Sequence, residues 1–439
     1  MLRANTMKEQ TVGVLGLGLS GRAALTALAT AGAKTFAFDD VVSTSDLPDI
    51  TLCDWRHWPW DRLDALVISP GVPHHFPKPH PAAAMAIRHG IEIISEVELA
   101  LRAKPKARLI AVSGTNGKST TTALIGHCLK EAGIAVSVGG NIGTPACALD
   151  DPGEDGFIVL EISSYQLETT PSLAADIAVL LNISPDHLDR HGGMEGYIAA
   201  KARLIDQMKP SGIAITGTAD AHIRRLSAQF RQKGTRVITV TAEDAPQALQ
   251  QSVSLAGAHN AENAAAAAAT LLHFGIDMTE IDRAIRSFQS LPHRLQPVAD
   301  CGKIRFVNDS KATNGVAAAK ALGAFRDIYW IAGGLAKEDG LQPVMPCLSA
   351  VKKAYLIGSA ANQFAASLKD ICPAAICGDL DTATRTAFQD ASATAEGGTI
   401  LLAPAAASFD QFKNFGVRGE AFADLARELC ATVRGHEHA

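Results

Sequence analysis

Short apolar runs alternate with stretches of helical periodicity along almost the whole chain. Several of these runs end in glycine or in a polar residue, as in RLIAVSG (108–114), FIVLEISS (157–164) and DIAVLLNIS (176–184). Helical patterns separate the runs, and a long alanine-rich pattern covers 260–274. Strands that are buried on both faces of a sheet are continuous apolar runs, and helices provide the crossovers between them. The pattern therefore predicts an α/β protein with mostly parallel sheets.

Turn and linker signals divide the chain into three blocks. The first covers 1–104 and ends in the charged, proline-containing stretch AKPKAR (103–108). The second covers 105–295 and closes on LPHR (291–294), and the third covers 296–439. A domain typically has about 150 residues, so this length also favours three domains. We expect three domains with these bounds.

Composition and charge exclude several classes of protein. Apolar residues make up 47% of the 439 positions, so each block can bury a core. The net charge of −5 and the scattered basic residues do not provide the basic face that a nucleic acid or an anionic membrane needs. The N-terminus lacks a signal-peptide pattern, and no run reaches the roughly 18 apolar residues of a membrane span. The eight dispersed cysteines include no CxxC pair, which favours reduced thiols. We expect a soluble, cytoplasmic protein with no nucleic-acid or membrane partner.

The strongest local motif is GTNGKST (114–120), between the strand LIAVS and a helical pattern. A glycine-rich turn at a helix N-terminus leaves backbone N–H groups free to bind phosphate. Lys118 would reach the β- and γ-phosphates of ATP, and the Ser119 hydroxyl would coordinate Mg²⁺. Val112 replaces the first glycine of the full pattern, so the alternative is a glycine turn that merely contains a lysine. The order strand, turn, helix favours the phosphate loop.

Polar residues follow the next two apolar runs of the second block. Glu161 ends FIVLE, and Asn182, Asp186 and His187 follow DIAVLL. A carboxylate at the carboxyl end of a parallel strand, beside a phosphate loop, is suited to hold Mg²⁺. An acidic strand end is also common without a ligand, so this residue remains open. For His187 and for Lys201 in YIAAK, the residues alone favour a solvated loop histidine and a surface lysine.

The first block carries a glycine pattern after its first strand. Gly16, Gly18 and Gly21 form G-x-G-x-x-G, and Asp39 follows 18 residues past Gly21. This spacing fits a turn that binds a diphosphate and an acid that binds a ribose hydroxyl. NAD and a UDP-sugar both supply these groups. The motif therefore leaves a nicotinamide-dependent oxidoreductase open as a second class of function.

The third block contributes two candidate segments. VNDSKATN contains Asp309 and Lys311 just after a strand, where they are candidates to bind a nucleotide and its phosphoryl group. In SFDQFKNF, the residues Ser408, Phe409 and Phe415 are candidates for a pocket wall. An ordinary helix start with packed aromatic residues explains DQFKNF equally well, and the residues alone favour it.

Taken together, these segments resemble the Mur ligases, a family of ATP-dependent amide-forming enzymes. The shared segments, in family order, are GTNGKST, GGNIG, LEISSYQLE, DHLDRHG, YIAAK, AHNAEN, LPHR, NDSKATN and SFDQFKNFGVRGE. The resemblance implies a Rossmann-like N-terminal domain that binds a UDP-sugar, a central P-loop-type ATPase domain and a Rossmann-like C-terminal domain. The last two segments resemble the members that add glutamate, although a ligase for another amino acid remains the alternative within the family.

The resemblance also implies a reaction and its ligands. It implies that ATP activates the carboxylate of UDP-N-acetylmuramoyl-L-alanine as an acyl phosphate, which the amine of D-glutamate attacks through a tetrahedral intermediate, with release of ADP and phosphate. Mg²⁺ and cationic side chains would offset the charges that meet there. The enzyme would act as a cytoplasmic monomer in peptidoglycan synthesis, on which cell shape and cell division depend.

The resemblance assigns each candidate residue to a ligand. The phosphate loop would consist of Gly114, Thr115, Asn116, Gly117, Lys118, Ser119 and Thr120. Further ATP contacts would come from Asn263, Arg294, Asp309 and Lys311. The metal ligands would be Ser119, Glu161, His187 and Lys201, the last as a carbamate formed with CO₂; Lys118, His187 and Lys201 would be catalytic. The UDP-sugar substrate would contact Leu19, Ser20, Asp39, Gly71 and Asn141, and D-glutamate would contact Thr313, Lys337, Ser408, Phe409 and Phe415.

Overall fold

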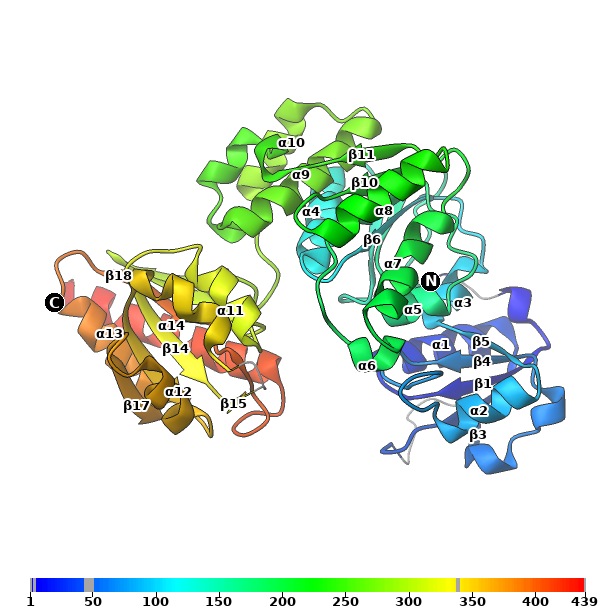
Figure 1. Cartoon of the computed structure of the whole chain (residues 1–439), viewed down its shortest axis with the longest axis horizontal. Coiled ribbons are helices and arrows are strands. Elements are labelled where there is room, and N and C mark those ends of the chain that lie inside the picture. Colours follow the sequence, from blue (N-terminus) through cyan, green and yellow to red (C-terminus); the bar gives the residue numbers. More distant parts are fainter. Residues whose placement is uncertain (1, 3–4, 43–50, 337–339, 438–439) are drawn as a thin grey trace. The chain divides into compact units, whose positions relative to one another are not determined.

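The computed structural model describes residue 2 and residues 5–42, 51–336 and 340–437 (Figure 1). The chain forms two compact units. Unit 1 consists of Met1–Pro246 and Glu262–Ala284, and unit 2 consists of Gln247–Ala261 and Ile285–Ala439. Within the described ranges, no helix is both long and apolar enough to cross a membrane.

The first sheet of unit 1 is parallel and lies within the first block. Its strand order is β3 (Thr51–Leu52), β2 (Lys34–Phe38), β1 (Thr11–Leu15), β4 (Ala65–Ile68), β5 (Glu92–Ile94). Its helices are η1 (Asn5–Met7), α1 (Leu19–Ala31), η2 (Trp55–His57), η3 (Trp60–Arg62), α2 (Pro81–Arg88) and α3 (Glu96–Leu101). The strand order reverses between β1 and β4: β2 and β3 lie on one side of β1, and β4 and β5 lie on the other. Open parallel sheets bind their ligands at such a switch point.

The second sheet of unit 1 is also parallel and lies within the second block. Its order is β11 (Val237–Thr239), β10 (Ile213–Thr216), β9 (Ile177–Leu180), β6 (Arg108–Ser113), β8 (Phe157–Glu161), β7 (Val136–Gly140). The helices of this block are α4 (Lys118–Glu131), η4 (Ala146–Ala148), α5 (Ser164–Glu168), α6 (Leu188–His191), α7 (Met194–Asp206), α8 (Ala221–Gln232), η5 (Ala242–Asp244), η6 (Gln247–Gln251), η7 (Val253–Leu255), α9 (Ala258–His273) and α10 (Met278–Ser287). In the register, Val112 pairs with Glu161 and Ser113 with Leu180, so the segments after β6, β8 and β9 meet at one edge.

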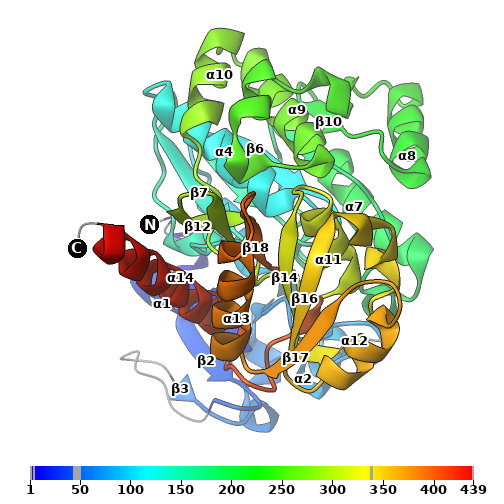
Figure 2. The same ribbon diagram turned by 90° about the vertical axis from the view of Figure 1, so that its left-hand side faces the viewer.

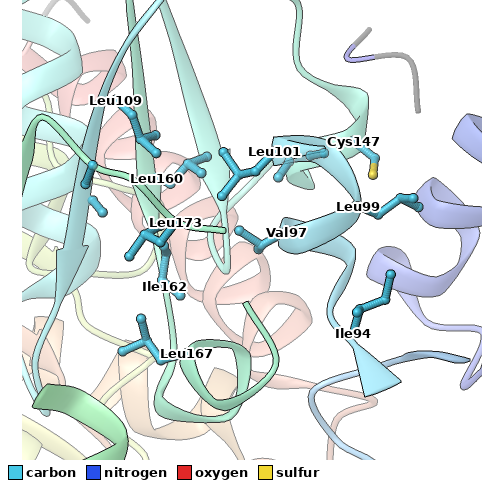
Figure 3. Packing of buried hydrophobic residues seen from close by; sticks show 14 of the residues in the cluster. Ile94, Val97, Leu99, Leu101, Leu109, Cys147, Leu160, Ile162, Leu167 and Leu173 are labelled. Carbon is cyan, nitrogen blue, oxygen red and sulfur yellow. The ribbon is translucent and has the colours of Figure 1, made fainter. Parts of the chain in front are cut away.

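One hydrophobic core runs through both sheets of unit 1. Helix α3 is buried at every position, and Ser95 caps it by accepting from the Glu98 N–H at 2.9 Å. Figure 3 shows Val97, Leu99 and Leu101 of α3 in the same cluster as residues of the second sheet such as Leu109 and Leu160. The short helix therefore contributes to a core that the two sheets share, and this explains why they form one compact unit.

The third sheet lies in unit 2 and carries helices on both faces. Its order is β12 (Gln296–Cys301), β13 (Ile304–Asn308), β18 (Gly398–Leu402), β14 (Ile328–Gly333), β16 (Val351–Ile357), β17 (Ala374–Gly378), and only the β12–β13 pair among these is antiparallel. The remaining elements are α11 (Gly315–Leu322), η8 (Gln342–Ala350), α12 (Ala361–Leu368), α13 (Leu380–Ser392), α14 (Phe415–Glu437) and an antiparallel pair of β15 (Leu335–Ala336) with β19 (Ala406–Ala407). Helices α11 and α12 cover one face of the sheet, and α13 and α14 cover the other (Figure 2). A separate hydrophobic core lies on each face, one with α11, η8 and α12 and the other with α13 and α14. The predicted α/β fold with parallel sheets is confirmed.

The cysteines depart from the sequence prediction at one pair. Cys301 in β12 and Cys430 in α14 form a disulfide, with a Cα–Cα distance of 5.2 Å. The expectation of reduced thiols is therefore wrong for these residues, which stand 129 positions apart and give no spacing signal. Cys53, Cys128, Cys147, Cys347, Cys372 and Cys377 are free.

Candidate active site

The predicted phosphate loop joins β6 to α4 in unit 1. Gly117 is the N-cap of α4 and has φ 85°, a conformation that side chains disfavour. A Cβ atom at this position would overlap the side-chain oxygen of Asn263, a predicted ATP contact on α9. The loop therefore needs glycine both for its backbone and for the close approach of Asn263. Ser119, in the first turn of α4, is 3% exposed.

Two lysines converge on the same loop carbonyl. Lys118 Nζ donates to the carbonyl oxygens of Gly114 and Thr115, both at 2.9 Å. Lys201 Nζ, on α7, donates to the Gly114 carbonyl at 2.7 Å and lies 4.8 Å from the centroid of the Tyr197 ring. Lys201 is only 1% exposed, so the interpretation of this residue as a surface lysine is wrong. Burial, together with the Lys118 charge, lowers the pKa of Lys201 well below its ordinary value, against the opposing effect of Asp186 and Glu161.

The segment after β9 is hydrogen-bonded to the phosphate loop. The Asn116 N–H donates to Asn182 Oδ1 at 2.9 Å, and Asn182 Nδ2 donates back to the Asn116 carbonyl at 3.1 Å. The Ser184 N–H donates to Thr115 Oγ1 at 3.0 Å, and that hydroxyl lies 3.0 Å from the Tyr197 hydroxyl. These bonds hold the segment that leads to His187 beside the phosphate loop.

Glu161 ends β8 with one carboxylate oxygen that lacks a protein partner. Its side chain is 2% exposed, and Oε1 accepts from Asn141 Nδ2 at 2.8 Å. Oε2 is buried and has no hydrogen-bond partner. A buried carboxylate oxygen normally binds a donor or a cation. Glu161 Oε2 therefore fits an Mg²⁺ ligand, and Asn141, a predicted substrate contact, lies next to it.

His187 occupies the αL region at φ 53° and is half exposed, with 51% of its side chain accessible. Its ring lies 5.1 Å from that of Tyr165, which stacks in turn on His191 at 5.3 Å. Burial lowers the pKa of His187, in part against the Asp186 charge, and Lys118 and Lys201 add to the lowering. A neutral imidazole is the form that binds a metal ion.

Side chains of helices α5 and α6 in the second block bind the loop that follows β4. Arg190 Nη1 donates to the carbonyl of Gly71, a predicted substrate contact, at 3.0 Å. Glu168 contacts His191 Nδ1 at 3.0 Å and His74 Nε2 at 3.4 Å. Burial lowers the pKa of His74 to about 4 even though the Glu168 charge opposes it, so His74 is neutral at pH 7. These contacts join the edge of the first sheet to the helices beside His187.

The glycine turn of the first sheet has the expected geometry. Gly16 has φ 91°, and a Cβ atom at Gly21 would overlap the Gly16 carbonyl, whereas the space around the Gly18 Cβ position is open. Asp39 accepts from the N–H groups of Leu17 at 2.6 Å and of Val41 at 2.8 Å. Burial alone would raise its pKa, but these and a third backbone donor lower it, so the carboxylate is ionised. A cavity of about 240 Å³ opens beside it.

The predicted contacts Leu19 and Ser20 begin α1 directly after this turn. Leu19 is 76% exposed although it is apolar. An exposed apolar side chain at the switch point is available to a ligand.

The predicted ATP contacts of unit 2 gather after β13. Asp309 is 9% exposed, and its Oδ1 accepts from the Leu295 N–H at 3.1 Å. Burial raises the pKa of Asp309 to about 6, while the Leu295 N–H and the Arg294 charge oppose the rise. Lys311 Nζ lies 5.2 Å from the centroid of the Phe415 ring. Asp309, Arg294, Lys311 and Phe415 thus come together in one region.

The predicted D-glutamate contacts that the structure describes lie at the same edge of the third sheet. Thr313 precedes α11 and is half-buried, Ser408 follows β19 and is 2% exposed, and Phe415 begins α14. Phe409 is 71% exposed. Lys337 lies outside the described residues.

Within the part of the chain that the structure describes, no three His, Cys, Asp or Glu side chains gather closely enough to hold a metal ion. Glu161 and His187 are two such candidates at the edge of the second sheet. The donor set fits Mg²⁺ through the buried, unpartnered Glu161 oxygen and the Ser119 hydroxyl, and a further anionic oxygen would complete it.

Comparison with known families finds matches over most of the chain. The model of the Mur ligase middle domain matches residues 112–271, and that of the Mur ligase glutamate ligase domain matches residues 293–406. The UDP-N-acetylmuramoylalanine–D-glutamate ligase of Rhodospirillum rubrum is 43% identical over 96% of this chain and 95% of its own length. The enzyme of the same name from Rhizobium meliloti is 43% identical over 96% of this chain and 97% of its own length.

A solved structure shares the fold at low sequence identity. The UDP-N-acetylmuramate-alanine ligase MurC from Thermotoga maritima aligns over 95% of this chain and 99% of its own, with a TM-score of 0.61 and 15% identity. At this identity the likeness shows the fold alone.

Proposed function

Because this chain belongs to the Mur ligase family, we propose that it is the ATP-dependent ligase that joins D-glutamate to UDP-N-acetylmuramoyl-L-alanine. The observation that carries the proposal is the 43% identity over nearly the full length with relatives that bear this name. The diphosphate that the first sheet binds is then that of a UDP-sugar, not of NAD.

The reaction requires an activated carboxylate. The carboxylate of the alanyl group attacks the γ-phosphorus of ATP, which forms an acyl phosphate and releases ADP. The amine of D-glutamate then attacks the acyl carbon, the resulting tetrahedral intermediate expels phosphate, and the ammonium loses a proton as the amide forms. Several anions meet in these steps, so cationic side chains and backbone N–H groups must offset their repulsion.

The phosphate loop of this chain supplies such groups. Lys118 donates to carbonyls of the loop itself, and its ammonium is within reach of a phosphate placed at the α4 N-terminus. Glu161, Ser119 and His187 would hold Mg²⁺, which supplies charge neutralisation when bound. Asn141 fixes the orientation of Glu161 through its 2.8 Å hydrogen bond.

Lys201 is the candidate for the missing anionic ligand. Its amine is buried and lies beside the Lys118 ammonium, an arrangement that favours a neutral amine. A neutral amine can attack CO₂ to form a carbamate, with loss of one proton. The carbamate would place an anionic oxygen beside the Lys118 ammonium. This oxygen would be attracted to Lys118 and would complete the set of oxygen ligands.

The UDP-sugar would bind at the switch point of the first sheet. Gly18 leaves space for the diphosphate, while Asp39 and the cavity beside it would accept the uridine. Leu19 and Ser20 follow the glycine turn, and Gly71 lies in the loop after the neighbouring strand β4. The hydrogen bonds of Arg190 and Glu168 to this loop would keep the sugar site aligned with the phosphate loop.

D-Glutamate would bind at the edge of the third sheet. Thr313 and Ser408 offer hydroxyl groups to its carboxylates, Lys337 offers a charge, and Phe415 offers an apolar wall. A site with such donors rejects an analogue that lacks the carboxylate, because its own polar groups are then left unpaired.

Several broader properties follow from the same proposal. The three blocks 1–104, 105–295 and 296–439 would act as the UDP-sugar domain, the ATPase domain and the domain that completes the ATP and amino-acid sites. We expect the enzyme to be a cytoplasmic monomer in peptidoglycan precursor synthesis, and its loss to affect cell shape and division.

Phosphate release with a panel of amino acids tests the function directly. With ATP, Mg²⁺ and UDP-N-acetylmuramoyl-L-alanine present, we expect release that depends on D-glutamate and is much slower with L-glutamate, D-alanine or L-lysine. Equal rates with another amino acid would assign the chain to a different member of the family. A change in NADH fluorescence on mixing would instead support the oxidoreductase alternative.

A further inference from the structure

Arg418, on α14 in unit 2, is a buried cation whose hydrogen bonds all go to loops at one edge of the third sheet. Its side chain is 1% exposed. Nε donates to Ser310 Oγ at 3.0 Å, and Nη2 donates to the Ser310 carbonyl at 2.9 Å. Nη1 donates to the carbonyls of Gly333 at 3.4 Å and of Ala406 at 3.2 Å, and Nη2 also reaches Ala406 at 3.2 Å. One guanidinium thus joins three separate segments.

These segments follow three parallel strands that lie side by side. Ser310 follows β13, Gly333 ends β14, and Ala406 lies in the segment after β18; the register pairs β18 with both β13 and β14. The Ser310 hydroxyl donates in turn to the Phe415 carbonyl at 2.8 Å, which ties the start of α14 to the same point.

The segments after β13 and β18 carry several of the predicted ligand contacts of unit 2. Asp309 and Lys311 flank Ser310, and Ser408 lies two residues beyond Ala406. Gly333 opens the turn to β15, which pairs with Ala406–Ala407. A shift of any one segment would therefore move an ATP contact relative to an amino-acid contact.

The partners of Arg418 are not those of an ordinary structural ion pair. Among the described residues, no carboxylate lies within ion-pair distance of its guanidinium. Burial lowers its pKa to about 10, with Asp410 opposing the shift, so the group stays charged at neutral pH. A buried charge is unfavourable unless its donors are satisfied, and here neutral carbonyls and one hydroxyl satisfy them. Only the planar fork of arginine offers five donors in the directions that three loops require.

We propose that Arg418 is a positioning residue, whose guanidinium holds the three strand-end loops in the one arrangement that binds ATP and D-glutamate together. This inference rests on the proposed function. Arg418 does not itself touch a substrate. Its effect reaches the ligands through Ser310, Gly333 and Ala406.

Steady-state kinetics of Arg418→Met and Arg418→Lys test the inference. For Arg418→Met we expect the KM values for ATP and D-glutamate to rise on the order of tenfold or more, because small displacements of binding groups have large effects. The KM for the UDP-sugar should stay unchanged, since its predicted contacts lie in unit 1. Arg418→Lys keeps the charge but not the fork, so it should show a smaller rise in the same two constants. Arg427→Met is the matched control, because Arg427 is an exposed residue of the same helix that pairs with the neighbouring Asp424; its kinetics should match wild type.

A merely structural role would give a different result. Loss of folded enzyme would lower the apparent kcat and leave all three KM values unchanged, and this outcome would overturn the inference. If Arg418→Met does not fold, Ser310→Ala carries the test, since it removes one acceptor of the fork. We expect it to raise the same two KM values several-fold, because it removes the hydroxyl that accepts from Arg418 Nε and donates to the Phe415 carbonyl. Unchanged values in Ser310→Ala and Arg418→Lys would also overturn the inference.

The proposed function and this inference fail in different ways. Wild-type enzyme that releases no phosphate with D-glutamate would refute the proposed function. Active wild-type enzyme whose Arg418 variants keep their KM values for ATP and D-glutamate would refute the positioning role alone.

Discussion

Replacement of Lys201 by alanine probes the proposed carbamate. The variant removes an amine that is 1% exposed and lies 2.7 Å from the Gly114 carbonyl. The folded state loses one hydrogen bond and the packing of a buried alkyl chain, an effect on the order of 1–3 kcal/mol. The reaction loses an anionic oxygen from a site where phosphates and carboxylates meet. Removal of one preorganised group at such a site lowers kcat by about 10²- to 10³-fold.

The assay is phosphate release at saturating substrates and well below the unfolding temperature. Tens of millimolar acetate or formate should partly restore Lys201→Ala, because a small carboxylate can occupy the space of the carbamate. Wild-type activity should fall in CO₂-depleted buffer and recover with bicarbonate, whereas the variant should not respond to bicarbonate. Lys209→Ala is the control, since Lys209 is an exposed lysine paired with Asp176. Near-normal activity of Lys201→Ala, or a wild type indifferent to CO₂ together with no rescue by carboxylates, would refute the reasoning.

Three further variants test other parts of the site. Gly117→Ala should abolish ATP-dependent turnover through overlap with a neighbouring side chain, whereas Gly133→Ala, also at positive φ but in open space, should stay active; equal activity of the two would contradict the phosphate-loop geometry. Burial raises the pKa of Asp309 to about 6, so ionisation of this carboxyl destabilises the folded state as the pH rises from about 4 through 6. At pH 8, Asp309→Asn should therefore increase the free energy of unfolding, measured by urea denaturation, by on the order of 2–3 kcal/mol. The variant should lose this advantage at pH 4 and bind ATP more weakly, and a variant less stable than wild type at pH 8 would contradict this. Thr313→Ala and Ser408→Ala should raise the KM for D-glutamate far more than that for ATP, and an effect on ATP alone would move these residues out of the amino-acid site.

Local patterns in the sequence were sufficient for the parallel α/β fold and for the glycine turn between β6 and α4, whose binding of phosphate stays a prediction. Buried central strands such as β6, β8 and β9 are continuous apolar runs, and the glycine turn of GTNGKST marks the helix that follows. Strands at the edges of the sheets cannot be predicted from long apolar runs. Strands β11 and β17 are largely exposed, so they lack the long apolar run that marks a central strand.

Features that depend on contacts across the fold were not predictable from local patterns. The neighbours of Lys201 indicated a surface lysine, and only the family resemblance assigned this residue to the site; its burial depends on packing that the local pattern does not show. The Cys301–Cys430 disulfide and the hydrogen bonds of Arg418 join residues far apart in sequence, where no spacing rule applies. The contact of Glu168 with His74 joins helix α5 of the second block to the loop after β4 of the first, so no motif within either block could indicate it.

The transfer of carboxylate oxygen tests the central claim most directly. UDP-N-acetylmuramoyl-L-alanine labelled with ¹⁸O in its carboxylate is incubated with the enzyme, ATP, Mg²⁺ and D-glutamate, and the phosphate and the nucleotide product are analysed by mass spectrometry. Activation as an acyl phosphate predicts that each released phosphate carries one labelled oxygen. It also predicts that the UDP-N-acetylmuramoyl-L-alanine gains one glutamyl residue. Unlabelled phosphate, or phosphate release without a glutamyl product, would contradict the assignment of this chain as a D-glutamate-adding ligase.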